Sequence, residues 1–362
     1  MRIIIGGDFS NELSGEPLAG LSSGNAEKVF DKNVLDLFKT ADELAVNLEC
    51  AVTESENRIK KFGPHLKAPF GTCKALKGAG VTFVTLSNNH IFDFGKEGVK
   101  DTMRELDKNG IKYTGYGKNE ADSRKDYIIE RDGLKIAVID VCEHEYTYAL
   151  ENREGARPYD PYDTSDDIAA AKKKADYVIV VYHGGKEFCR YPSPRLYKLC
   201  RSMIKHGADV VLCQHSHCVG CYENFDGGHI LYGQGNFYFI DKKAYGTEKE
   251  ALWNNGLAVV LDVDKSGIKF TPVPVVMKDD MLYLAEGKEK DKILNGLYER
   301  GQTLADGSYV NGWRAFCETV PYYKTAVPPE NADMLGHWLD CEAHYDVLRE
   351  LYKTYNHTNE LD

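Results

Sequence analysis

The sequence has no long apolar run. Nowhere in its 362 residues does a window approach the roughly 18 apolar residues that a membrane-spanning helix requires. The chain also starts with a short strand-like run, Arg2 to Ile5, and not with the charged and apolar regions of a secretory signal peptide. Both absences predict a cytoplasmic protein without a membrane span, unless an anchor lies outside the sequence given.

A surplus of positive charge is also missing. The chain has 45 Lys and Arg against 56 Asp and Glu, a formal net charge of -11. Nucleic acids and anionic membranes are polyanions, so this balance argues against non-specific binding to either. Low-complexity tracts and internal repeats are absent too, and the 43% hydrophobic and 28% charged fractions are typical of a globular protein with a sizeable core.

The ten cysteines do not reach the density of a small disulfide-stabilised domain. Cys218-Val219-Gly220-Cys221 has the spacing of a zinc or redox motif, yet no second pair stands at zinc-finger distance. We therefore expect reduced, half-buried thiols, with a structural zinc at this motif as the lesser alternative.

Short apolar runs alternate with amphipathic helical stretches, which is typical of α/β layering. The predicted strands cover residues 2–7, 44–48, 81–86, 111–114, 177–182 and 209–213. Apolar residues at helical spacing predict crossover helices near residues 29–41, 99–106 and 196–204. Turn sequences at 132–133, 226–228 and 264–267 predict three hairpins, so β-rich layers accompany the parallel units.

The pattern changes after about Met281, where helical spacing with many aromatic residues takes over. Because the chain exceeds the usual single-domain length, we predict a main domain at residues 1–280 and a helical C-terminal appendage at 281–362. Met334, Leu335, Trp338, Leu339 and Leu348 predict a long amphipathic helix in the appendage. Its aromatic residues are more typical of a packing cap or dimer surface than of a ligand site.

Polar residues follow five of the six predicted strands, at the point where each apolar run stops. These residues are Asp8, Asn47 with Glu49, Asn88-Asn89-His90, His183, and His215-Ser216-His217. In open α/β sheets, ligands bind beyond the carboxyl ends of the strands. Each residue alone is more typical of a turn, a helix cap or a satisfied histidine, but five corresponding positions favour one shared site.

The candidate metal ligands combine two carboxylates, one amide oxygen and three imidazoles. They are Asp8, Glu49, Asn89, His183, His215 and His217. This mixture suits manganese, iron or zinc better than calcium or magnesium. A carboxylate such as Glu49 can bridge two ions about 3.5 to 4 Å apart. The set predicts one or two divalent ions and hydrolysis by a metal-activated water.

The same blocks, in this order, resemble the CapA family of poly-γ-glutamate capsule biosynthesis proteins, which belongs to the calcineurin-like metallophosphoesterase superfamily. The blocks are Gly7-Asp8, Asn47-Leu48-Glu49, Asn88-Asn89-His90 with Asp93 and Gly95, His183-Gly184-Gly185-Lys186-Glu187, His215-Ser216-His217 and Gly235-Asn236-Phe237. The resemblance covers about residues 1–280 and depends on order and spacing, not on any single block. It implies a four-layer α/β/β/α metallophosphoesterase-like sandwich, with the helical appendage added.

The resemblance also implies a role for each block. Asp8 and His217 would hold a first metal, Glu49 would bridge, and Asn89, His183 and His215 would hold a second metal. His90 falls at the position of a general acid, and Asp93 lies where it could orient that imidazole. Lys186, Glu187 and Arg190 lie in a stretch implied to face the substrate, although structural salt bridges are an equal alternative for such charges.

One block departs from the superfamily pattern, because Ser10 stands where a histidine is usual. Serine is a poor ligand, so the first metal has fewer donors, and a mononuclear site stays open. In the loop after Glu49, Arg58, Lys60, Lys61, His65 and Lys67 favour slightly the attraction of a polyanion over a merely solvated loop.

The leading interpretation is a metal-dependent hydrolase of the CapA type. It would act on a phosphate ester or on an amide in a glutamate-containing polymer, so the expected partner is a polyanionic or phosphorylated small molecule or polymer. One alternative is a non-catalytic scaffold or binding protein with a degenerate metal pocket. Another is a nucleotide phosphodiesterase, in which Tyr238 or Phe239 would stack on a base.

Overall fold

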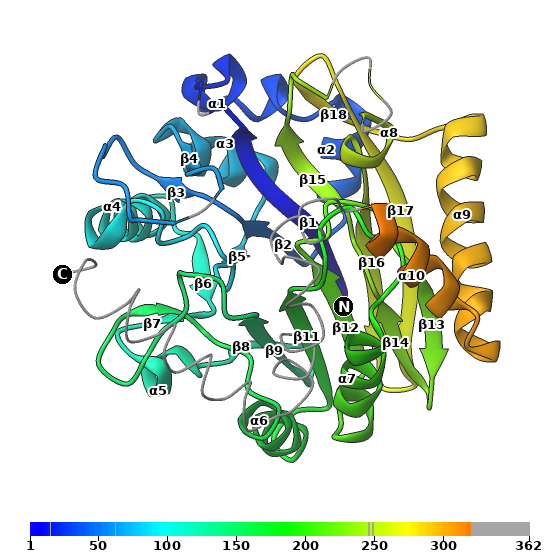
Figure 1. Ribbon diagram of the computed structural model, residues 1–362. Helices are drawn as coiled ribbons and strands as arrows, with labels where there is room; N and C mark the ends of the chain where they lie inside the picture. The colour runs from blue at the N-terminus through cyan, green and yellow to red at the C-terminus, as the bar shows by residue number, and fades with distance from the viewer. Residues whose placement is uncertain (15, 62, 245–246, 248–249, 320–362) are drawn as a thin grey trace, which may run out of the picture.

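The computed structural model describes residues 1–319 apart from 15, 62, 245–246 and 248–249, and its strands form two large sheets with helices on their outer faces (Figure 1). The larger sheet has eight strands, in the order β18-β17-β16-β1-β2-β5-β6, with β15 also paired to β1. Their bounds are β1 Arg2–Glu12, β2 Glu43–Leu48, β5 Phe83–Thr85, β6 Lys112–Thr114, β15 Asn236–Ile240, β16 Asn255–Asp264, β17 Gly267–Lys278 and β18 Met281–Leu284.

The second sheet has six strands, in the order β13-β14-β12-β11-β9-β8. Their bounds are β8 Tyr127–Arg131, β9 Leu134–Cys142, β11 Tyr177–His183, β12 Val210–Gln214, β13 Tyr222–Phe225 and β14 Gly228–Leu231. Two short pairs complete the strands: β3 (Ala51–Val52) with β4 (Lys67–Ala68), and β7 (Tyr116–Gly117) with β10 (Gly155–Ala156). The predicted hairpins are confirmed as the antiparallel pairs β8–β9, β13–β14 and β16–β17.

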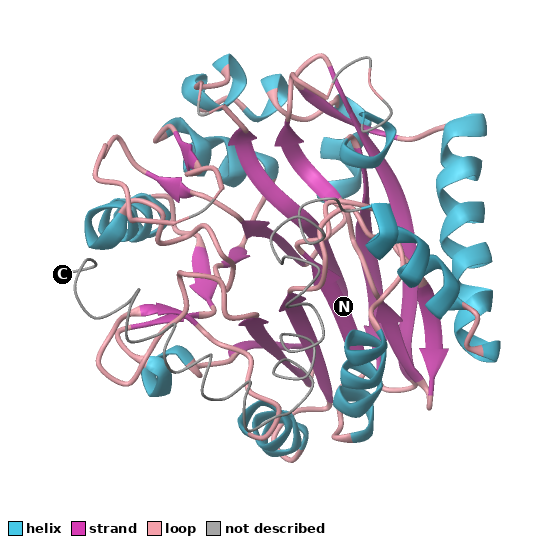
Figure 2. Ribbon diagram, viewed as in Figure 1, coloured by secondary structure: helices cyan, strands magenta, loops and turns pink. Residues whose placement is uncertain are grey.

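The helices connect these strands (Figure 2). They are α1 Ala19–Ser23, the 3-10 turn η1 Ala26–Lys28, α2 Lys32–Phe38, α3 Gly71–Ala79, α4 Gly95–Lys108, α5 Glu120–Ser123, α6 Asp163–Lys172, α7 Pro194–Lys205, α8 Glu250–Trp253, α9 Gly287–Asp306 and α10 Tyr309–Thr319. In α7, Pro194 occupies the first turn and the Ser193 hydroxyl accepts a hydrogen bond from the Leu196 amide, as expected at a helix start. Among the described residues, none of these helices has the length and apolar composition needed to cross a bilayer.

Three apolar clusters show that the layers are stacked in the predicted α/β/β/α order. Successive side chains of a strand point to opposite faces, so Ile3 and Ile5 of β1 meet Ile179 and Val181 of β11 between the sheets. Ile4 faces the other way, toward the layer formed by η1, α2 and α3. On the far side, α6 and α7 cover the second sheet. The predicted four-layer sandwich is confirmed.

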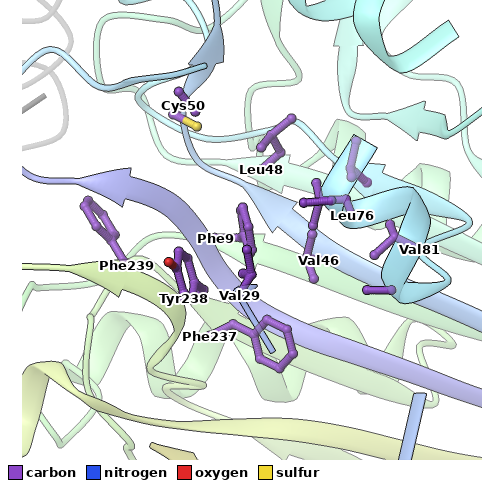
Figure 3. Packing of buried hydrophobic residues seen from close by; sticks show 14 of the residues in the cluster. Phe9, Val29, Val46, Leu48, Cys50, Leu76, Val81, Phe237, Tyr238 and Phe239 are labelled. Carbon is purple, nitrogen blue, oxygen red and sulfur yellow. The ribbon is translucent and has the colours of Figure 1, made fainter. Parts of the chain in front are cut away.

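The strand predictions are confirmed in place, but β1 is longer than predicted. It continues past residue 7 to Glu12, because β15 pairs with it in parallel at Asp8, Phe9 and Glu12. Figure 3 shows Phe9 among the side chains of β15 and β2, and its ring lies 5.2 Å from that of Tyr238. Gly7 permits this approach, since a Cβ there would lie 2.2 Å from the Gly235 carbonyl oxygen.

The C-terminal helices are confirmed for the described part of the chain. Ile293 and Leu297 of α9 pack into the cluster between the sheets, and Leu304 with Tyr309 joins the cluster under α7. The helix predicted around Met334 to Leu348 lies outside the described residues. The division of the chain at residue 280 stays a prediction.

Candidate metal centre

The six predicted metal ligands come together in one buried site. Asp8 lies in β1 where its pairing with β2 is irregular, Glu49 follows β2, and His183 ends β11. Asn89 lies in the loop after β5, and His215 and His217 lie in the turn after β12. Asp8 and Glu49 are 0% exposed, and the other four are at most 7% exposed. Such deep burial of charged groups is typical of metal or catalytic sites.

Two donor groups share Glu49. In one, ligand atoms of Glu49, His183 and His215 lie within 4.8 Å of one another, and in the other those of Asp8, Glu49 and His217 do so. The first group has Asn89 beside it, with its Oδ1 3.0 Å from His183 Nε2. We call the set with Glu49, Asn89, His183 and His215 the full half of the site, and the set with Asp8, Glu49 and His217 the lean half.

Glu49 supplies the test of whether these residues fit a metal. Neither of its carboxylate oxygens has a hydrogen-bond partner among the described residues, although the side chain is fully buried. Burial, followed by repulsion from Asp8, raises the pKa of Glu49 well above its ordinary value. A buried carboxylate without a partner is strongly unfavourable, and a divalent ion would satisfy both oxygens at once. The donor set therefore fits the predicted cofactor.

A chain of side-chain amides holds the full half in place. Asn88 Oδ1 accepts the His90 and Ile91 amides, which leaves its Nδ2 to donate to Asn47 Oδ1 at 3.0 Å. Asn47 Nδ2 then faces Asp8 Oδ1 at 2.8 Å and His183 Nδ1 at 3.1 Å. Each amide orientation fixes the next, so the side chains that surround the donors have one consistent hydrogen-bonding arrangement.

The imidazole ring of His217, in the lean half, is also held in one orientation by a neighbouring amide. Asn236 Nδ2 donates to the Trp253 carbonyl oxygen, which points Asn236 Oδ1 at His217 Nδ1, 2.8 Å away. Nδ1 therefore carries the proton, and Nε2 is left to face Glu49 Oε1 at 3.9 Å. Ser10, where the superfamily pattern has a histidine, is buried at 1% exposure, and its hydroxyl has no hydrogen-bond partner among the described residues.

Charge in the site is set by burial and by neighbouring acids. Burial lowers the pKa of His183 to about 3, so this imidazole is neutral and able to bind a metal. Burial opposes charge on His215 as well, but the carboxylates of Glu145, Glu187 and Glu49 outweigh it and raise the pKa.

The predicted acid, His90, lies beside the donors without belonging to either group. Its Nδ1 is 2.7 Å from Asp93 Oδ2, the geometry expected if Asp93 orients the ring. Burial, and then the positive charge of Lys61, lower the pKa of His90 to about 4, so the ring is neutral at pH 7 here. The roles of His90 and Asp93 stay predictions.

The three predicted substrate residues do not all lie in the same place. The pKa of Glu187 is lowered: burial would raise it, but the charges of His215 and His217, together with other cationic groups, outweigh burial. Glu187 therefore lies near these two histidines. Lys186 Nζ is 3.7 Å from Glu187 Oε2. Arg190 instead lines a small cavity of about 70 Å³ with Arg300 and Lys292. A substrate role for these three stays a prediction.

Three further expectations, for a base-stacking aromatic, a basic surface loop and a cysteine zinc site, concern side chains that the structure buries. Tyr238 and Phe239 are 0% and 1% exposed, so neither offers a face to a nucleotide base as the phosphodiesterase alternative required. Lys61 of the basic loop is buried and pairs with Asp93, and Lys67 pairs with Glu56, so these two do not form a free basic surface. Cys218 and Cys221 are buried free thiols, and no metal-ligand group among the described residues includes them.

Two residues that the sequence did not assign to the metal centre also lie beside it. Glu145 accepts a hydrogen bond from Asn89 Nδ2 at 2.9 Å, and Lys61 Nζ lies 3.0 Å from His90 Nδ1. Glu145 lies three residues after β9, and nothing in the sequence distinguishes it from the acids near it. Lys61 stood out only as one member of the basic loop, not as a neighbour of His90.

The fold and the donor set define a two-sheet α/β sandwich protein with a candidate dimetal centre at the carboxyl ends of its strands. Residues 3–241 match the family described as bacterial capsule synthesis protein PGA_cap, and the chain belongs to this family. The predicted CapA resemblance is thereby confirmed.

Individual relatives agree with this assignment. Over 283 residues the chain is 30% identical to the capsule biosynthesis protein CapA of Bacillus anthracis, covering 74% of this chain and 69% of that protein. Over 219 residues it is 33% identical to the PGA biosynthesis protein CapA of Bacillus subtilis, covering 59% of this chain and 57% of that one. The match therefore spans little more than half of the second relative.

Solved structures with partial similarity include a phosphatase from Mycoplasma pneumoniae, with a TM-score of 0.48 and 16% identity over 77% of this chain and 94% of that one. A putative 5'-nucleotidase from Staphylococcus aureus has a TM-score of 0.48 and 13% identity, over 84% of this chain and 58% of that one. At this level of similarity, no residue role is taken from either.

Proposed function

We propose that this chain is a metal-dependent hydrolase of the CapA type that takes part in making or processing poly-γ-glutamate or a similar capsule polymer. The bond attacked would be a phosphate ester or an amide. The observation that carries the proposal is the shared Glu49, whose two buried oxygens accept no hydrogen bond from the described residues and which belongs to both groups of candidate metal donors. The choice of polymer is based on the names of the relatives, which refer to capsule and PGA biosynthesis.

The chemistry would divide between the cofactor and the chain. One or two bound manganese, iron or zinc ions would polarise the scissile group and activate a water. The chain's own task is to hold the donors, exclude bulk solvent and deliver a proton. Asp8, Glu49 and the three histidines would bind the ions, and Asn89 would add an amide oxygen.

His90 would protonate the leaving group. Asp93 holds its Nδ1, which directs Nε2 away from the Asp93 side of the ring. A neutral imidazole must first gain a proton, and an anionic substrate next to the ring would favour that gain by opposing Lys61. Glu187, near the histidines, and Lys186 would contact the substrate at the edge of the site.

The proposal is tested by metal content and turnover together. The full chain is loaded with Mn²⁺, freed of excess metal and assayed for bound metal, then for hydrolysis of an aryl phosphate and of a γ-glutamyl anilide. We expect at least one ion per chain and turnover of one of the two substrates. His215→Ala should lose both properties, whereas His206→Ala, at the exposed end of α7, should lose neither. Absence of bound metal after loading would overturn the proposal.

A binding protein with a metal pocket is the second candidate, and Ser10 favours it. With a serine in place of a fourth donor, the lean half offers three candidate ligands, so it would hold its ion more weakly than the full half and could leave hydrolysis without a second metal. This candidate predicts metal uptake and binding of a glutamate oligomer without hydrolysis of either test substrate.

A further inference from the structure

Glu145 lies in the loop that follows β9. Because β9 and β11 are parallel, with Cys142 opposite His183, this loop leaves the sheet beside a metal donor. The loop is tied to the donor loop, since the Thr147 hydroxyl donates to the Asn88 carbonyl oxygen at 2.5 Å. The Glu145 side chain is 46% exposed, so it stands at the edge of the site and outside both donor groups.

The two carboxylate oxygens of Glu145 face two different donors of the full half. Oε2 accepts a hydrogen bond from Asn89 Nδ2 at 2.9 Å. Oε1 lies 3.7 Å from His215 Nε2, the ring nitrogen on the side away from the donor group. One side chain therefore contacts two of the four residues that would hold the second metal.

Both donors turn their other polar atom toward His183. With its Nδ2 held by Glu145, Asn89 directs Oδ1 to within 3.0 Å of His183 Nε2. With Nε2 turned toward Glu145, His215 directs Nδ1 to within 3.2 Å of the same nitrogen. Oδ1 and Nδ1 are the atoms with lone pairs available to an ion, and both converge on one point.

A carboxylate suits this position better than an amide. It has two acceptor oxygens and no donor, so it can accept from the Asn89 amide and from a His215 N–H together. A histidine that binds a metal through one nitrogen usually donates its other N–H to a carboxylate or carbonyl, which fixes the tautomer and the ring orientation.

We propose that Glu145 is a positioning residue of the metal centre, which holds Asn89 and His215 with their ligand atoms directed at the second metal. This inference rests on the proposed function only in assuming that the site binds a metal. It does not depend on which bond is hydrolysed, or on whether any is.

The test compares Glu145→Ala and Glu145→Gln with a control in the same loop, Glu151→Gln, whose side chain is exposed. Mn²⁺ affinity is measured by calorimetry on the metal-free full chain. The visible spectrum of the Co²⁺-loaded protein reports the ligand geometry separately. We expect Glu145→Ala to bind Mn²⁺ about 10 to 100-fold more weakly, as is typical when a residue behind a metal ligand is removed.

Glu145→Gln should lose less Mn²⁺ affinity, because the new carbonyl oxygen can still accept a hydrogen bond from Asn89. Some loss should remain, because the new NH₂ group and the His215 Nε2–H are both donors and cannot bond to each other. Both variants should change the Co²⁺ spectrum, and Glu151→Gln should match the unchanged protein. The metal-free variants should melt within about 2 °C of the unchanged protein, since Glu145 is partly exposed.

Equal Mn²⁺ affinity and an identical Co²⁺ spectrum in Glu145→Ala would overturn this inference and leave the proposed function standing. A matching loss in Glu151→Gln would also overturn it, because the effect would then be one of charge alone. If the unchanged protein itself takes up no metal, the proposed function fails, and this inference fails with it.

Discussion

The two halves of the site are built from the same kinds of side chain but are not equally complete. The full half has four donors, from Glu49, Asn89, His183 and His215, and the Glu145 carboxylate lies behind two of them. The lean half has Asp8, Glu49 and His217, with Ser10 two residues after Asp8, whose hydroxyl has no hydrogen-bond partner among the described residues.

The difference lies in the number of candidate donors, because the lean half has supporting side chains too: Asn236 orients His217 and Asn47 donates to Asp8. Four-coordinate metal sites are closed, whereas a site with three protein donors keeps an open position for water or substrate. We therefore expect the full half to hold its ion tightly and the lean half to hold one weakly or only with substrate present. Each prediction below sets one half against the other.

The largest effect should come from removing one histidine from each half in turn. His215→Ala takes a donor from the full half and should weaken the tighter ion by more than about a hundredfold, beyond the loss typical of an outer residue. His217→Ala should leave that ion in place and remove only the weaker one. Metal stoichiometry after extensive dialysis distinguishes the two, and equal losses would end the idea of unequal halves.

His90 provides the next largest effect. It adjoins Asn89 yet is a predicted acid, so His90→Asn should leave the metal affinity of both halves unchanged. Turnover of the aryl phosphate should fall about a hundredfold or more, the usual contribution of a positioned acid. The KM should change little. Loss of metal in this variant would make His90 a ligand and the full half larger than described.

Ser10→His should reduce the difference in metal affinity between the two halves. An added imidazole two residues after Asp8 gives the lean half a fourth donor, and the ion of the lean half should bind about tenfold more tightly. Ser10→Ala removes only the hydroxyl and should change neither ion. Calorimetric titration with Mn²⁺ measures both steps. If Ser10→His folds normally and the weaker step is unaffected, the missing histidine does not explain the lean half.

The smallest effect on the metal should come from Asp140, which anchors the start of the loop that carries Asn89. Its Oδ2 accepts the Leu86 and Ser87 amides, and burial raises its pKa to about 8 from an ordinary value of 3.8. A carboxyl whose folded-state pKa is raised stabilises the protein below its unfolded pKa, and this stability is lost as the pH rises toward the folded value.

Asp140→Asn keeps an acceptor oxygen for both amides but does not titrate. Relative to this variant, the unchanged protein should lose about 5 kcal/mol of unfolding free energy between pH 4 and pH 8. Urea unfolding at several pH values measures the difference. Metal content at pH 7 should be the same in both, and a difference that does not vary with pH would show that Asp140 is ionised throughout.

Much of the fold could be predicted because its signals are local. Ile3, Ile4 and Ile5 form an apolar run that can be read directly, and Asp132-Gly133 turns a hairpin wherever it lies. The length of β1 could not be predicted, since it depends on β15, more than two hundred residues away. The candidate metal donors could be found because each follows an apolar run in the sequence, and parallel strands bring the carboxyl ends of such runs together.

The supporting residues were harder to predict because their partners are distant in sequence. Glu145 is indistinguishable in sequence from the acids around it, and its role depends on Asn89 being 56 residues away. Lys61 lies in a charged loop typical of solvent, but folding buries it against Asp93. Conversely, Arg190 is close in sequence to His183, yet the turn after β11 carries it to another cavity.

The backbone at His215 and His217 has a further consequence. Their φ angles are 77° and 50°, in the left-handed region where residues other than glycine are disfavoured, typically by about 1 to 3 kcal/mol each. Glycine at either position would relieve that strain and give a more stable metal-free chain. The two imidazoles thus stand against the preference of their own backbone, and the chain carries this strain at the very turn that brings both rings to the candidate metal centre.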